Sequence, residues 1–61
     1  MELTINVNGI EYIIDKGLAK DQINKLGKEE AIKFWKNVEE ETQEKFKAKI
    51  IRGLIEEIKE N

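Results

Sequence analysis

The sequence contains no cysteine, histidine, proline or serine. Without cysteine and histidine, a disulfide-bonded scaffold and the zinc sites that these two residues form are both excluded. The catalytic dyads and triads that pair a serine or cysteine nucleophile with a histidine base are excluded as well. No apolar run reaches six residues, so the sequence offers no candidate membrane span, and we expect no membrane partner.

The reactive side chains that remain are threonines, one tyrosine, lysines and carboxylates. None of them falls in a motif typical of phosphate, dinucleotide or metal binding. Neighbouring carboxylates such as Glu40 and Glu44 are common on solvated helices, and a chain of 61 residues has little bulk with which to enclose a substrate. We therefore predict that the protein is not an enzyme, needs no metal or cofactor, and has no small-molecule substrate.

The composition also bears on compartment and source. Met1-Glu2 leads into an alternating segment, without the basic and apolar regions of a signal peptide. Together with the lack of cysteine, this predicts a cytoplasmic protein. Lysine, isoleucine, asparagine and glutamate dominate, whereas the only arginine is Arg52. This bias is typical of AT-rich genomes and suggests a low-GC bacterium, a phage or another mobile element as the source.

The beginning of the chain predicts a β-hairpin over residues 2–15. Apolar and polar residues alternate on both sides of Asn8-Gly9, the dipeptide that best tolerates the positive φ angles of a type I′ turn. Such a turn places three apolar pairs on one face: Val7 with Ile10, Ile5 with Tyr12, and Leu3 with Ile14. A hairpin alone is barely stable in water, so this face must pack against helices, while both strand edges stay open.

The rest of the chain has the period of helices. A short helix is expected over residues 18–26, ended by Gly27 in the left-handed conformation. A long helix is expected over residues 28–60, bent or broken near residues 40–44. These elements predict one small α+β domain that spans residues 1–61, and a chain of this length builds only a marginal core.

Two apolar stripes lie along the long helix. The first consists of Ala31, Ile32, Trp35, Val38, Thr42 and Phe46, and the second of Ile50, Ile51, Leu54, Ile55 and Ile58. The second is rotated by roughly a quarter turn, more than the drift of about 20° per heptad in a straight helix. Either the helix bends or breaks, or its halves pack against different surfaces. Phe34 lies beside the first stripe, where the hairpin covers it or where it is an aromatic anchor for a partner.

Charges along the chain occur in blocks of alternating sign. The net charge is −3 over residues 1–15, +3 over 16–36, −4 over 37–44, +4 over 45–52 and −2 over 53–61. Two antiparallel copies of the long helix would place each acidic block beside the other copy's basic block. The predicted interface, with a second copy or another protein, consists of Trp35, Val38, Phe46, Ile51, Leu54, Ile55 and Ile58. Alternatively, the charges solvate a single helix and the apolar stripe belongs to the core.

A marginal core favours the homodimer. We therefore predict a small regulatory or inhibitory protein that forms a homodimer and acts by binding another protein. The alternative is a DNA-binding transcriptional regulator with a helix-turn-helix-like middle, whose contacts to nucleic acid are Lys25, Lys28, Lys33 and Lys36. Side chains that read bases are scarce on that segment and the overall charge of −2 is acidic, so nucleic acid is the second choice of partner.

Overall fold

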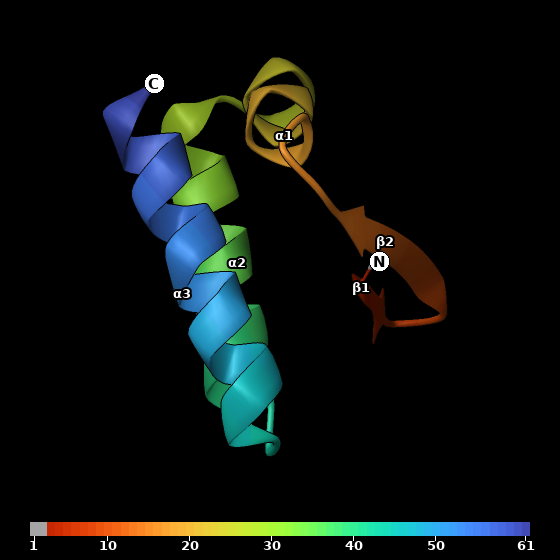
Figure 1. Cartoon of the computed structure of the whole chain (residues 1–61). Coiled ribbons are helices and arrows are strands. Elements are labelled where there is room, and N and C mark those ends of the chain that lie inside the picture. Colours follow the sequence, from red (N-terminus) through yellow and green to blue (C-terminus); the bar gives the residue numbers. More distant parts are fainter. Residues whose placement is uncertain (1–2) are drawn as a thin grey trace.

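The computed structural model describes residues 3–61 and contains a two-stranded antiparallel sheet followed by three helices (Figure 1). The elements are β1 (Leu3–Val7), β2 (Ile10–Ile14), α1 (Leu18–Leu26), α2 (Lys28–Glu41) and α3 (Lys45–Glu60). Helices α2 and α3 lie side by side, α1 crosses one end of the pair, and the hairpin lies to one side (Figure 1). The predicted α+β class is confirmed. The first residue of the predicted hairpin, residue 2, lies outside the described residues.

The hairpin has the register that its sequence predicts. The inner-face pairs are Val7 with Ile10, Ile5 with Tyr12, and Leu3 with Ile14. Asn8 and Gly9 have φ angles of 53° and 86°, as a type I′ turn requires. The backbone N–H of Gly9 donates to Oδ1 of Asn6 at 3.1 Å, which braces the turn. Local turn chemistry and the alternating pattern therefore agree.

Gly27 joins α1 to α2 without an intervening loop. Its φ of 84° and ψ of 155° lie in a region that is essentially open to glycine alone. Its N–H donates to the carbonyl of Ile23 at 2.8 Å, and its own carbonyl accepts from the N–H of Ala31 at 2.9 Å. One residue thus ends α1 and begins α2, and the helix predicted over residues 18–26 is confirmed.

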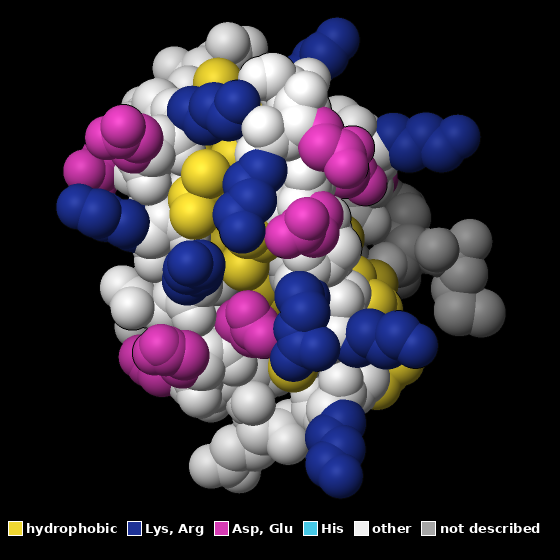
Figure 2. All heavy atoms as spheres, turned by 90° about the vertical axis from the view of Figure 1, so that its left-hand side faces the viewer, with side chains coloured by type: hydrophobic (Ala, Val, Ile, Leu, Met, Phe, Trp, Pro, Cys, Tyr) yellow, Lys and Arg dark blue, Asp and Glu magenta, His cyan; other side chains and the backbone are white. Residues whose placement is uncertain are grey.

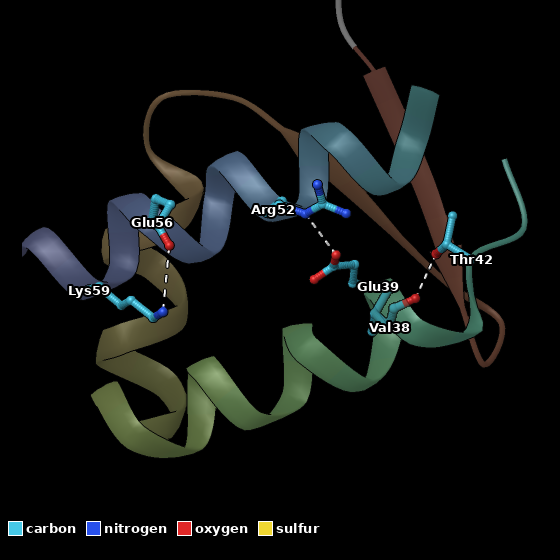
Figure 3. Close-up of polar contacts among 6 residues, drawn as sticks. All are labelled: Val38, Glu39, Thr42, Arg52, Glu56 and Lys59. Carbon is cyan, nitrogen blue, oxygen red and sulfur yellow. Dashed lines mark hydrogen bonds and ion pairs between the residues drawn. The ribbon is translucent and has the colours of Figure 1, made fainter. Parts of the chain in front are cut away.

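Residues 42–44 divide the predicted long helix into α2 and α3. Thr42 and Glu44 have extended backbones, with φ near −80° and ψ near 120° at both positions. The hydroxyl of Thr42 donates to the carbonyl of Val38 at 2.6 Å at the end of α2 (Figure 3). In a straight helix the two apolar stripes would point to different sides. The break resolves this mismatch, because it lets the Ala31–Val38 part of the first stripe and the second stripe face the same core, whereas Phe46 lies beyond the break and is exposed.

The core combines the apolar faces of the three helices with part of the hairpin. Its buried apolar residues are Ile5, Leu18, Ala19, Ala31, Trp35, Val38, Ile51, Leu54, Ile55 and Ile58. The ring of Trp35 meets the rings of Tyr12 and Phe34 edge-on, with centroids 5.2 Å apart in both pairs. This aromatic cluster (Tyr12, Phe34 and Trp35) attaches the hairpin to α2 with the geometry that aromatic pairs prefer.

One polar side chain, that of Gln22 in α1, is buried in this core. The indole N–H of Trp35 donates to Oε1 of Gln22 at 3.0 Å, so the buried donor has a partner. This role of Gln22 was not predicted from the sequence. The signal that was present is a tryptophan on a core stripe, since a buried indole N–H needs an acceptor from a neighbouring element.

Candidate protein-binding surface

Six of the seven residues predicted to form an interface lie in the core of the single chain. Each is at most 9% exposed: Trp35, Val38, Ile51, Leu54, Ile55 and Ile58. In the folded chain the hairpin and the neighbouring helices already cover them, so they offer no exposed surface to a partner. Phe46 differs, since it is 66% exposed in the first turn of α3.

The antiparallel helix pairing predicted between two copies forms within one chain. Nε of Arg52 donates to Oε2 of Glu39 at 2.9 Å (Figure 3), and Nζ of Lys28 donates to the carbonyl of Asn61 at 3.1 Å. The first contact joins the acidic end of α2 to the middle of α3, at the last residue of the basic block 45–52. The second joins the opposite ends of these helices. By turning at residues 42–44 the chain brings its own acidic and basic blocks together, with one ion pair between them, so the charge pattern does not require a homodimer.

The four lysines predicted to contact nucleic acid are interspersed with acidic groups. Lys25 lies 3.4 Å from Asp21, Lys33 lies 4.0 Å from Glu30, and Lys28 is bonded to the carbonyl of Asn61. At 100° per residue, Lys33 and Lys36 share their side of α2 with Glu29 and Glu40. These carboxylates lower the positive potential that phosphate binding requires.

The face on the α3 side of the molecule is also of mixed charge. Figure 2 shows Lys and Arg side chains alternating with Asp and Glu side chains there, with apolar atoms visible between them. Two ion pairs are formed by side chains of α3: Lys47 lies 3.0 Å from Glu44, the residue before the helix, and Lys59 lies 3.5 Å from Glu56 (Figure 3). Charges of both signs therefore occur on this face.

An apolar groove opens between the turn end of the hairpin, the end of α1 and the middle of α2. Its volume is about 280 Å³, and its lining consists of Ile10, Tyr12, Gln22, Lys25, Leu26 and Phe34. Ile10 is 58% exposed and Leu26 is 42% exposed, although Ile10 lies on the hairpin face that is directed toward the helices. We call this surface the Ile10 groove. Its exposed apolar side chains are adjacent to one another. Isolated exposed apolar residues are common on protein surfaces, whereas a contiguous group is typical of an interaction site.

A second groove lies between β1 and the C-terminal half of α2. This β1 groove has a volume of about 350 Å³, and Val7 and Val38 supply apolar parts of its lining. Phe34 lines both grooves. Its ring is partly buried and lies 6.1 Å from the ring of Tyr12. The hairpin therefore packs against one side of the ring, and both grooves reach the ring from other sides. A role of Phe34 as an anchor for a partner stays a prediction.

Neither groove contains the groups of a reactive centre. Within residues 3–61, no cluster of acidic residues is placed to hold a metal ion. The helices of this part of the chain are all too short or too polar to cross a membrane. Comparison of the chain with protein-family models, with curated proteins and with solved structures finds no match.

Proposed function

We propose that the protein is a small regulatory or inhibitory protein, not an enzyme, that acts by binding another protein at the Ile10 groove. The observation that carries this proposal is the exposure of Ile10 and Leu26 beside the partly buried ring of Phe34. Exposed apolar area of this kind adds nothing to the stability of a domain whose core is already marginal. Its exposure is therefore better explained by binding than by folding. Aromatic and aliphatic side chains grouped in a concave surface are typical of the sites that contribute most to binding energy.

The rim of the groove indicates the chemistry of the partner. Lys25 lies at this rim with its ammonium group mostly exposed, and its ion pair with Asp21 is a weak surface pair. A partner segment that combines an apolar side chain with a nearby carboxylate would fill the groove and pair with Lys25. We therefore expect an acidic, apolar-anchored segment of the partner to bind there.

Photo-crosslinking in the producing cells tests the proposal. A benzophenone amino acid is placed at Ile10, and in a matched chain at Ile13, which is 46% exposed on the opposite face of the same strand. We expect a discrete protein adduct from Ile10 and none from Ile13. Adding Leu26→Lys should lower the yield of that adduct by about tenfold, the effect of losing one strong apolar contact. Identical adducts from both positions, or a yield that Leu26→Lys leaves unchanged, would refute the proposal.

The DNA-binding alternative makes a different prediction. It requires binding to duplex DNA that weakens as salt is added and that is lost on charge reversal at Lys33 and Lys36. Such a result, without any adduct from Ile10, would replace the proposal made here. The mixed charge around these lysines makes them the weaker candidate surface.

A further inference from the structure

Strand β1 has a free edge. Within the described residues the sheet contains two strands, so each strand has one partner. The turn closes on the pair Val7–Ile10, and hydrogen-bonded pairs alternate along antiparallel strands. Thr4 and Asn6 therefore direct their backbone N–H and C=O groups away from β2. These groups form a row of donors and acceptors that another strand can use.

Strand β1 also lacks the features by which proteins usually block strand addition. The segment Leu3–Val7 contains no charged residue and no proline, and it pairs with β2 without a bulge. The free edge of β2 differs, because its outward-directed residues are Glu11 and Ile13. If β2 paired with itself about a two-fold axis, Glu11 would oppose a second Glu11, Ile13 or Asp15, depending on whether the axis lies at residue 11, 12 or 13. Each of these pairings sets a carboxylate against an apolar residue or against another carboxylate and is unfavourable, so the free edge of β1 is the one suited to self-pairing.

The sequence of β1 is complementary to itself in one register. When two β1 strands run antiparallel about a two-fold axis at Ile5, Thr4 of each copy opposes Asn6 of the other. Both residues direct their backbone groups outward, so these pairs form the hydrogen bonds, and their polar side chains share the outer face. On the inner face Leu3 opposes Val7, and Ile5 opposes its own counterpart. Each pair therefore matches two apolar or two polar uncharged side chains, and no charged side chain lies opposite another residue of the strand.

The β1 groove provides space beneath the added strand. In this register Leu3 of the second copy lies next to Val7, above a groove of about 350 Å³ that Phe34 and Val38 also line. Both Leu3 and Val7 are only partly buried within the single chain. The pairing therefore covers apolar surface that the single chain leaves accessible, in addition to satisfying the free backbone groups.

We propose that β1 pairs with β1 of a second copy of this chain, in register about Ile5, to form a four-stranded antiparallel sheet. A two-stranded sheet is only marginally stable in water, and two further strands remove that weakness. The contact uses the β1 edge and the β1 groove, whereas the proposed partner site is the Ile10 groove on the other side of Phe34. Each proposal therefore stands or fails without the other.

Backbone N-methylation provides the sharpest test, because a chain of this length is accessible to chemical synthesis. Methylation at Thr4 removes one outward-directed N–H and leaves the side chain and the bonds to β2 intact. Methylation at Ile13 does the same at the free edge of β2 and is the matched control.

In sedimentation equilibrium we expect the unmodified 7.1 kDa chain to dimerise. Methylation at Thr4 should raise the dimer dissociation constant by about thirtyfold, since each dimer loses two hydrogen bonds of ordinary strength. Methylation at Ile13 should leave that constant unchanged.

A second measurement identifies the register. Leu3 and Val7 of one chain are about 13 Å apart along an extended strand, too far for a nuclear Overhauser effect between their methyl groups. In a mixture of isotope-labelled and unlabelled chains, we expect an intermolecular effect between Leu3 and Val7. A monomer at the highest soluble concentration, or a dimer that is insensitive to methylation at Thr4, would overturn the proposal. A chain that stays monomeric but loses a protein partner on methylation at Thr4 would also overturn it, and would assign this edge to that partner.

Discussion

Trp35 lies where three elements meet. Its ring contacts Tyr12 of β2 and Phe34 of its own helix, and its indole N–H is bonded to Gln22 of α1. A buried hydrogen bond of this kind adds modestly to stability when formed and costs more when one partner is removed. The pair Trp35–Gln22 therefore fixes how α1 is placed against α2.

Replacing Gln22 by methionine tests this role. Gln22→Met keeps the length and approximate volume of the side chain but leaves the indole N–H without an acceptor. We expect the free energy of unfolding to fall by about 1–3 kcal/mol in urea denaturation. The matched control is Gln43→Met at an exposed position, which should change it by less than about 0.5 kcal/mol. Equal effects at the two positions would show that the bond to Trp35 contributes nothing.

Two glycines should respond to alanine with opposite signs. A Cβ atom at Gly27 or at Gly53 would meet no atom within 4 Å, so packing does not distinguish them. Gly27 has a φ of 84°, which strains alanine, whereas Gly53 lies inside α3. We expect Gly27→Ala to lower the free energy of unfolding by about 1–3 kcal/mol, and Gly53→Ala to raise it by about 0.5–1 kcal/mol. Thermal and urea unfolding measure both, and the same sign for both would contradict the backbone argument.

At the scale of elements, the two helix ends at the break carry charges of unfavourable sign. The segment Glu39–Glu41 is at the C-terminal end of α2, and α3 begins with Lys45 and has no acidic residue in its first turn. Both arrangements oppose the helix dipole, at a cost of about 0.3–1 kcal/mol per charge. Burial of each large apolar side chain contributes about 1.5–3 kcal/mol, and the break lets Trp35 and Val38 of the first stripe be buried together with most of the second. Tertiary packing therefore outweighs local electrostatics at residues 42–44.

A better cap at the start of α3 should stabilise the protein. Glu44 occupies the N-cap position with an extended backbone, but its side chain makes no capping hydrogen bond. The shorter side chain in Glu44→Asp can accept from the free N–H groups of the first turn, so we expect the free energy of unfolding to rise by about 0.5–1 kcal/mol. Glu44→Gln, which keeps the length and removes the charge, should give no such gain. Loss of stability in both variants would show that the pair Glu44–Lys47 matters more than the missing cap.

At the scale of the whole molecule, the parts that local signals specify were predictable. Asn8-Gly9 and the alternation around it specify the register of the hairpin, and Gly27 specifies the end of α1. The packing of α2 on α3 was not predictable in the same way. The helical period shows that Ile51 and Leu54 lie on an apolar face that must be buried. It does not show whether they are buried against this chain or against another. The charge blocks pair equally well within one chain and between two. Only the turn at residues 42–44 determines that these helices pair within one chain. That turn contains neither glycine nor proline, so the sequence gives no strong local signal for it.

The candidate binding surface shows a second limit of sequence reasoning. The alternation in β2 places Ile10 on the inner face, and this is correct. Its exposure depends on how far α1 and α2 extend beneath the hairpin, which no local pattern encodes. Phe34 gave the one usable signal, because an aromatic residue beside a core stripe marks the margin of the core. The structure places both grooves at that margin.

The position of Trp35 makes the intrinsic fluorescence of this protein informative in solution. The chain has one tryptophan and one tyrosine, and their rings are 5.2 Å apart. Excitation of Tyr12 therefore passes to Trp35 by resonance energy transfer, and emission comes from a single fluorophore shielded from solvent. Phe34 lies against that fluorophore and also lines both grooves. The protein thus contains its own optical reporter, sensitive to hairpin docking and to occupancy of either groove, with no attached dye.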